Sequence, residues 1–158
     1  LLSSLCSAAE RKSWKESQEI HGITPAMVRG KPTFSEIFPQ VKEILYKAKK
    51  VIAYNISFEM GFLQLYDMAN GFPGGYRLDQ MIDWGPDPMY MYSAYTLNEK
   101  WRKLDVAAAH FKYSYEKHDA LEDAKATLFV YKSIVKYIEA HPDKECILKY
   151  GMAYDETP

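Results

Sequence analysis

The sequence predicts an α/β fold in which helices flank a sheet. Two segments, residues 33–49 and 119–138, carry apolar residues at the spacing of one helix face. Between them, the short continuous apolar run at residues 51–54 suits a buried central strand. The chain has 158 residues and a net charge of −1. We therefore expect a single domain over residues 1–158, without the overall basic charge that favours nucleic-acid binding.

A turn is expected before the first of these helices. Pro25 punctuates the chain there, and Thr24 just before it suits the start of a short helix. The helix over residues 33–49 then opens with a capping box, since Thr33 is followed three residues later by Glu36. Both helix starts are therefore marked by side chains that hydrogen-bond to the first turn.

The apolar run at residues 51–54 leads directly into another helix. Phe58, Phe62 and Leu65 have the spacing of a core-facing stripe, which predicts that they are buried. Glu59 would lie in the first turn of this helix, just beyond the strand, where ligands of α/β proteins bind. A carboxylate at this position also commonly serves only to offset the helix dipole on the surface, and that alternative is open.

The second half of the chain carries one more strand and several helices. A short strand is expected at residues 76–78 and a short helix at residues 104–111. Residues 83–95 are rich in proline, methionine and tyrosine, which permits two interpretations. They form either an aromatic platform for unpaired bases or a segment that packs its own rings on the core, and the second is favoured. Residues 141–158 are expected to form a peripheral tail.

The segment at residues 118–128 holds the residues around which a site is expected. Asp119 is predicted to be the N-cap of a helix, with Glu122 as its capping-box partner. His118 would lie on the preceding loop and Asp123 in the first turn, so both face the helix N-terminus. The core-facing stripe is predicted to comprise Leu121, Ala124, Leu128, Tyr131, Val135 and Ile138.

A histidine beside a carboxylate at a helix mouth suits metal-assisted hydrolysis. The carboxylate of Asp123 would hold a hard cation, and the imidazole of His118 would take a proton from the attacking water. The alternative is an N-capped surface helix preceded by an ordinary histidine, and this short motif by itself does not decide between them.

The cysteines and the hydropathy pattern bear on where the protein is found. Cys6 and Cys146 are far apart and fit no metal-binding or disulfide spacing, so free thiols and a cytoplasmic location are expected. No apolar run in the sequence is long enough to span a membrane. The chain begins at Leu1 rather than at a methionine, which leads us to expect a fragment or a processed product.

Three segments in order carry a family resemblance: IHGIT at residues 20–24, YNISFEMGFL at 54–63 and HDALEDAKATL at 118–128. Through them, the chain resembles the DnaQ-like 3′–5′ exonucleases of the DEDDh type over about residues 18–138. This group contains the proofreading epsilon subunit of bacterial DNA polymerase III. The resemblance implies an RNase H-like fold, with a mixed central sheet flanked by helices, and two divalent metal ions, Mg²⁺ or Mn²⁺.

The resemblance also implies roles for residues of this chain. His118 would be the general base, while Glu59 and Asp123 would be both catalytic and metal-binding. The substrate would be the 3′ end of single-stranded DNA or RNA, hydrolysed by a two-metal mechanism, and a DNA polymerase is a partner that the resemblance suggests. The residues implied to contact the substrate are His21, Gly22, Thr24, Asn55 and Phe58.

The chain departs from the family pattern at several positions. Glu59 occupies the position of the usual aspartate, and Tyr54 stands where a histidine is common. In addition, no Asp-x-Glu motif precedes His21, although the family carries one on its first strand. We therefore expect the fold to lack its first hairpin, and residues 1–158 alone to have little or no nuclease activity.

Two functions are compatible with these residues. The first is a 3′–5′ exonuclease that is incomplete as given. The second is a catalytically inactive module on the same fold that binds nucleic acid or another protein. A strand carrying Asp-x-Glu upstream of Leu1 would favour the first. An unrelated α/β domain with chance motifs is a third, disfavoured alternative, and the choice between DNA and RNA is open.

Overall fold

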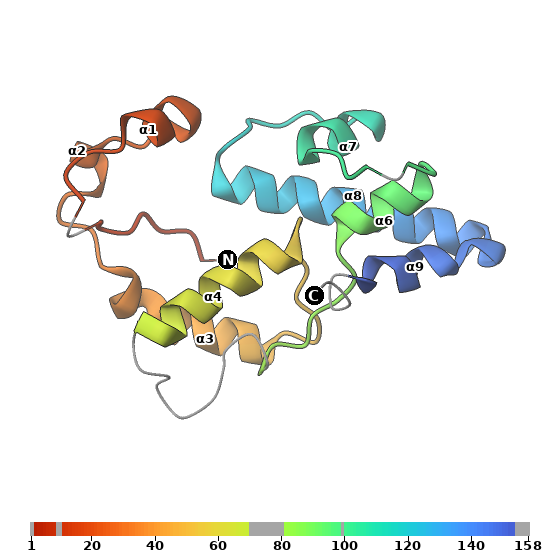
Figure 1. Ribbon diagram of the computed structural model, residues 1–158, viewed down its shortest axis with the longest axis horizontal. Helices are drawn as coiled ribbons and strands as arrows, with labels where there is room; N and C mark the ends of the chain where they lie inside the picture. Colours follow the sequence, from red (N-terminus) through yellow and green to blue (C-terminus); the bar gives the residue numbers. More distant parts are fainter. Residues whose placement is uncertain (1, 9–10, 70–80, 99, 154–158) are drawn as a thin grey trace.

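The protein is described by a computed structural model over residues 2–8, 11–69, 81–98 and 100–153. The regular secondary structure of these parts is helical, and Figure 1 shows α6, α7, α8 and α9 gathered at one side of the molecule. The helices are α1 (Lys15–His21), α2 (Pro25–Val28), α3 (Phe34–Lys47), α4 (Ile56–Ala69), α6 (Pro88–Tyr95), α7 (Leu104–His110), α8 (Ala120–Ala140), the 3₁₀ helix η1 (Pro142–Lys144) and α9 (Cys146–Gly151).

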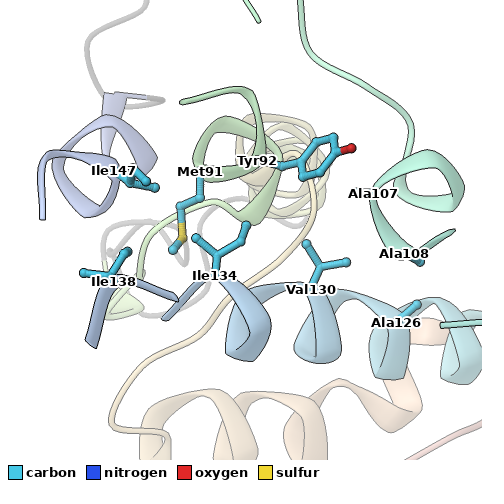
Figure 2. Packing of buried hydrophobic residues seen from close by; sticks show 9 residues of the cluster. All are labelled: Met91, Tyr92, Ala107, Ala108, Ala126, Val130, Ile134, Ile138 and Ile147. Carbon is cyan, nitrogen blue, oxygen red and sulfur yellow. The ribbon is translucent and has the colours of Figure 1, made fainter. Parts of the chain in front are cut away.

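The core lies where α6 and α7 pack against the long helix α8 and α9 packs against α6 (Figure 2). Val130 and Ile134, near the middle of α8, are fully buried. Ala107 and Ala108 on α7 are also fully buried, and side chains this small allow two helices to approach closely. Removal of this apolar surface from water is the main force that holds these helices together. The buried cluster comprises Met91, Tyr92, Ala107, Ala108, Ala126, Val130, Ile134, Ile138 and Ile147.

The core-facing stripe of α8 differs from the predicted one. Ile138 belongs to both stripes, but Leu128, which was predicted to be buried, is 43% exposed. Both stripes have helical spacing, so the pattern alone does not distinguish two neighbouring faces of one helix. The contact with α7 decides the face, since Ala107 and Ala108 share the buried cluster with another small residue, Ala126 (Figure 2). The buried residues of α8 are Ala126, Thr127, Val130, Ile134 and Ile138.

No β-sheet forms within the described residues, so the predicted α/β fold with an RNase H-like central sheet is wrong for this structure. The apolar run at residues 51–54 makes one isolated parallel bridge, between Val51 and Trp84. The Val51 amide donates to the Asp83 carbonyl at 2.9 Å, and the Gly85 amide donates to the Val51 carbonyl at 2.8 Å. An apolar run becomes a strand only where a neighbour pairs with it over several residues, and this pairing stops after Val51.

The helix α3 begins as predicted, with Thr33 as its N-cap. The Glu36 amide donates to the Thr33 hydroxyl at 3.3 Å, and the Thr33 amide donates to the Glu36 carboxylate at 2.7 Å, which completes the capping box. Aromatic rings then join α3 to α4, because Phe34 and Phe38 both contact Tyr66. These ring contacts give α4 a partner helix on one side.

The stripe that was predicted to bury α4 faces solvent instead. Phe58, Phe62 and Leu65 are 58%, 57% and 62% exposed. The prediction is wrong because helical spacing defines a face without showing whether another element covers it. Ile56, at the start of α4, is fully buried. The start of the helix is therefore anchored by burial, while its later part is joined to α3 through Tyr66.

The tyrosine- and methionine-rich residues 83–95 belong to the core. They include α6, whose Met91 and Tyr92 are buried, so the favoured interpretation is confirmed and the exposed aromatic platform is wrong. The short helix predicted after them is also confirmed, as α7. The strand predicted at residues 76–78 lies outside the described residues.

The C-terminal tail, predicted to be peripheral, takes part in the core as far as it is described. Ile147 on α9 is only 4% exposed. The Gly151 carbonyl at the end of α9 accepts a hydrogen bond of 2.7 Å from the Asp87 amide, just before α6. The prediction is wrong for α9 because its short apolar patch finds a partner in α6, which sequence spacing does not reveal.

Two further features of the described residues concern the lengths of the helices and the state of the cysteines. None of their helices combines the length and the apolar character that crossing a lipid bilayer requires. Cys6 and Cys146 are both free thiols, as predicted.

Candidate active site

A cavity of about 900 Å³ opens among the starts of three helices, α4, α7 and α8. Its size suits a small ligand or one end of a larger one. Glu59, His118 and Asp123 come from separate segments of the chain and line this one space. The lining residues are Ile52, Ala53, Tyr54, Asn55, Phe58, Glu59, Lys103, Leu104, Asp105, Tyr115, Lys117, His118, Ala120, Asp123, Ala124 and Thr127.

A buried carboxylate, that of Asp87, fixes the start of α4 at the cavity. It accepts hydrogen bonds from the amides of Asn55 at 3.1 Å, Ile56 at 2.7 Å and Met89 at 2.8 Å. Desolvation raises the pKa of Asp87, while the three backbone hydrogen bonds oppose this shift because they favour the charged form. Asp87 is thus the N-cap of α6 and also holds the first amides of α4.

Glu59 lies in the first turn of α4, as predicted. It lines the cavity and also borders a second, apolar cavity of about 690 Å³ between α3 and α4. Desolvation raises the pKa of the Glu59 carboxyl, although the residue as a whole is exposed. A negative charge at this position would therefore be stabilised by a cation beside it.

The start of α8 presents Asp123 to the cavity. Asp119 is its N-cap, as predicted, because its carboxylate accepts the amides of Leu121 and Glu122, both at 3.0 Å. The predicted capping-box role of Glu122 is wrong, since the Glu122 carboxylate pairs with Lys125 at 2.6 Å. The cap nonetheless fixes the first turn, in which Asp123 lies.

Tyr115 lies beside Asp123 in the cavity. The pKa of Tyr115 is raised to about 12, chiefly by desolvation and in addition by the nearby charges of Asp123 and Asp105. Tyr115 therefore stays protonated at neutral pH. The Thr127 hydroxyl donates to the Asp123 carbonyl at 2.8 Å, a contact within the first turns of α8.

His118 occupies the left-handed region of backbone space, with φ of 69°. Asn55, across the cavity, does the same with φ of 71°. Histidine and asparagine adopt this conformation more readily than most residues, at a cost of roughly 1–2 kcal/mol. An ion pair of 2.7 Å between Lys117 and Asp105 ties the loop just before His118 to the start of α7. The hydrogen bond from Lys117 lowers the pKa of Asp105 and so keeps this pair charged at neutral pH.

Three of the predicted substrate-contacting residues lie elsewhere. His21 ends α1, and its Nδ1 accepts the Ile23 amide at 3.0 Å. Gly22 is the C-cap of α1, with a left-handed φ of 70° that glycine adopts without strain. Thr24 is the N-cap of α2 and accepts the Met27 amide at 3.3 Å. None of the three lines the cavity.

Comparison with known proteins adds to this geometry. Residues 4–131 match the RNase_T family, whose description is exonuclease. The chain belongs to this exonuclease family. It is also similar to the uncharacterized exonuclease CP81 of Escherichia phage 186, with 32% identity over 134 residues. The matched region is 77% of this chain and 66% of the relative, so the chain spans just under two thirds of that relative's length.

A divalent metal ion is the cofactor that this exonuclease family implies. Glu59 and Asp123 have the carboxylate oxygens that a hard divalent cation prefers. Within the described ranges, however, no three His, Cys, Asp or Glu side chains lie close enough to bind a metal ion together. Mg²⁺ is usually held by one or two carboxylates, with waters and substrate phosphates as the remaining ligands. The two carboxylates therefore fit such a cation as part of a shared ligand set.

Several lining residues of this cavity were not predicted from the sequence. They are Lys103, Asp105, Tyr115 and Lys117. A signal for the last two is present in the run KYSYEK before His118, where two tyrosines lie between two lysines. Aromatic rings combined with basic side chains are typical of surfaces that bind single-stranded nucleic acid.

Proposed function

We propose that the protein is a 3′–5′ exonuclease that hydrolyses nucleic acid with two divalent cations, Mg²⁺ or Mn²⁺, and with His118 as the general base. One observation carries the proposal: Glu59, His118 and Asp123 line the same cavity. Two carboxylates and an imidazole around one space are the groups that metal-assisted phosphodiester hydrolysis uses. Membership of the exonuclease family over residues 4–131 supports the same chemistry.

Each side chain of the cavity would have a separate role in this reaction. Glu59 and Asp123 would hold the cations, which supply the positive charge that phosphodiester cleavage needs. His118 takes the proton of the attacking water, on a loop that the Lys117–Asp105 ion pair steadies. Tyr115, whose protonated hydroxyl lies near the charge of Asp123, would donate a hydrogen bond to this carboxylate and orient it.

The 3′-terminal nucleotide of a DNA or RNA single strand would enter this cavity. Asn55 and Phe58 line the side formed by α4, and Phe58 offers an exposed ring on which a base can stack. Substrate contacts from His21, Gly22 and Thr24 stay a prediction, as does partnership with a DNA polymerase.

The test is digestion of a 5′-labelled single-stranded oligonucleotide in Mn²⁺ or Mg²⁺. We expect slow shortening from the 3′ end one nucleotide at a time, because two carboxylates position the cations less firmly than a complete ligand set. Asp123→Asn should abolish this activity. The matched control is Asp143→Asn, which changes an exposed aspartate of η1 that does not line the cavity. Cleavage that survives Asp123→Asn, or internal cleavage products, would contradict the proposal.

A second candidate function is favoured by one observation, the lack of a three-ligand metal cluster among the described residues. In this alternative, the cavity binds a nucleic-acid end without hydrolysing it. The same assay separates the two functions when binding is measured beside turnover. An oligonucleotide that binds, stays intact in either cation and is bound equally well by Asp123→Asn would support the binding module.

A further inference from the structure

An exposed aromatic and basic loop joins α6 to α7 (Figure 1). Trp101 is 65% exposed, which is unusual for so large a ring. Lys100, Arg102 and Lys103, beside it in the chain, are all exposed as well. The aromatic rings of α6 serve the core, so this loop is a separate feature of the surface.

The loop is fixed at the edge of the cavity. The Tyr54 hydroxyl donates a hydrogen bond of 2.7 Å to the Arg102 carbonyl. Desolvation is the main cause that raises the pKa of Tyr54, so this hydroxyl stays protonated and keeps donating. Tyr54 and Lys103 both line the cavity, and Lys103 is the N-cap residue of α7. The loop is therefore held at the edge of the cavity by the hydrogen bond to Arg102, and its residue Lys103 borders the cavity.

The charges of the loop are available to a ligand. In the part of the chain that the structure describes, none of the ion pairs involves Lys100, Arg102 or Lys103. Asp105, the acidic residue in the first turn of α7, is already paired with Lys117. A net charge of −1 for the whole chain means that any polyanion must be attracted locally, and this loop is a local concentration of positive charge.

We propose that residues 100–103 bind single-stranded nucleic acid next to the cavity. Trp101 stacks on a base, while Lys100, Arg102 and Lys103 contact the flanking phosphates. The inference rests on the proposed function, which places the terminal nucleotide in the cavity. The loop then binds the nucleotides that precede it, and the preferred substrate is a single strand longer than a dinucleotide.

The chemistry of the loop favours nucleic acid over a protein partner. An exposed tryptophan is also common in protein interfaces. However, lysine is depleted in such interfaces, whereas three cations around one ring match the alternation of base and phosphate along a single strand. The adjacent cavity, with its carboxylates and its two lysines, would hold the terminal nucleotide of the same strand.

The first test measures binding of 5′-fluorescein-labelled oligothymidylate and oligouridylate by anisotropy, in a chelator so that nothing is cleaved. Trp101→Ala should weaken binding about 5- to 150-fold, and Trp101→Phe should recover much of the loss because it keeps a ring for stacking. The control Tyr150→Ala removes another exposed ring, on α9 and outside the cavity lining, and should leave binding unchanged. No binding by the wild type, or equal binding by Trp101→Ala, would overturn the inference.

The second test is the salt dependence of the same binding. Arg102→Ala should reduce the slope of log K against log salt by about 0.7, the value for loss of one phosphate contact on a single strand. Lys136→Ala, at an exposed position of α8 away from the cavity lining, should leave the slope unchanged. An unchanged slope for Arg102→Ala would contradict a phosphate contact.

Failure of this inference is distinguishable from failure of the proposed function. Trimming of a dinucleotide in Mn²⁺ requires only the cavity, so Trp101→Ala should spare it while slowing the trimming of longer strands. If Trp101→Ala trims both substrates like the wild type, the loop is not a binding site and the exonuclease proposal stands. If the strand binds through Trp101 but is never trimmed, the loop is a binding site and the exonuclease proposal fails.

Discussion

The Asp87 carboxylate accepts the Ile56 amide at 2.7 Å, although the two residues are 31 positions apart in the chain. Asp87 precedes α6, a helix of the core, and Ile56 begins α4, the helix that carries Glu59. Both residues are fully buried. This hydrogen bond therefore joins the candidate active site to the part of the molecule with the most extensive packing.

Replacing Asp87 with alanine should destabilise the protein strongly. The change leaves the amides of Asn55, Ile56 and Met89 buried without their acceptor, and each such loss costs about 1–3 kcal/mol. Since the chain relaxes and water enters in part, we expect a loss of about 3–5 kcal/mol in the free energy of unfolding. Urea denaturation followed by circular dichroism measures it.

Two further variants serve as comparisons for Asp87→Ala. Asp87→Asn keeps one acceptor oxygen and should lose less stability than Asp87→Ala. Ser93→Ala removes a buried side chain of the same helix, whose hydroxyl donates to the Met89 carbonyl at 3.2 Å without contacting α4. It should cost only about 1 kcal/mol. A loss for Asp87→Ala no greater than that for Ser93→Ala would show that the carboxylate does not hold α4.

Gly151 lies where α9 packs against α6, and alanine in its place should be destabilising. A Cβ atom there would lie 2.6 Å from Cγ of Met91 and 2.8 Å from Cβ of Pro86, both closer than van der Waals contact. Overpacking of this kind costs about 1–3 kcal/mol, measured by thermal or urea denaturation. In contrast, Gly61→Ala in α4 meets no atom within 4 Å and should stabilise the protein by about 0.5–1 kcal/mol. A neutral Gly151→Ala variant would mean that α9 shifts freely on α6.

Helix starts were predictable from sequence because their signals are local. Thr33 and Asp119 cap their helices through hydrogen bonds to amides two or three residues later. Which face of a helix is buried depends instead on distant partners. Leu128 and Phe62 have core spacing, yet each is exposed because no described element covers it. The run at residues 51–54 failed as a strand for the same reason, since its apolar character does not supply a neighbour to pair with.

The candidate site shows the same division between local and distant information. The positions of Glu59, His118 and Asp123 relative to their helix starts follow from local signals, and the starts of those helices meet at one cavity. Asp87 had only the local signal of a helix N-cap, an Asp followed by Pro88, and Trp101 had no signal. Asp87 gains its importance from amides far away in the chain, and Trp101 is distinguished by exposure, which only the folded arrangement reveals.

Glu59→Gln should stabilise the metal-free protein at neutral pH. Desolvation raises the folded-state pKa of Glu59, so its favourable contribution to stability is complete below the ordinary value of 4.5 and is lost as the pH rises through the raised pKa. Glutamine avoids this loss. The free energy of unfolding in a chelator should therefore be higher for Glu59→Gln at neutral pH, and equal to that of the wild type below pH 4.5.

Glu36 is the control for Glu59, because its pKa is shifted in the opposite direction. Hydrogen bonds from Thr33 lower the pKa of Glu36, so its contribution is present at neutral pH and is lost as the pH falls through the lowered value. Glu36→Gln should thus destabilise at neutral pH only. Addition of Mg²⁺ or Mn²⁺ should stabilise the wild type and have a smaller effect on Glu59→Gln. A Glu59→Gln variant that loses stability in the chelator would show that the carboxylate is not held in a desolvating environment.

His118→Asn separates the chemistry of the imidazole from the conformation of its backbone. Asparagine tolerates the left-handed φ of 69° at this position, so the fold and the loop should be retained and the melting temperature should change little. Loss of the general base should nevertheless slow trimming of an oligonucleotide by about 10²–10⁴-fold. Oligonucleotide binding in a chelator should stay unchanged, and free imidazole in the assay should restore part of the rate.

His110→Asn, at the exposed end of α7 outside the cavity lining, is the matched control and should trim like the wild type. If His118→Asn trims at the wild-type rate, the proton of the attacking water goes to another acceptor, and the role proposed for His118 is wrong.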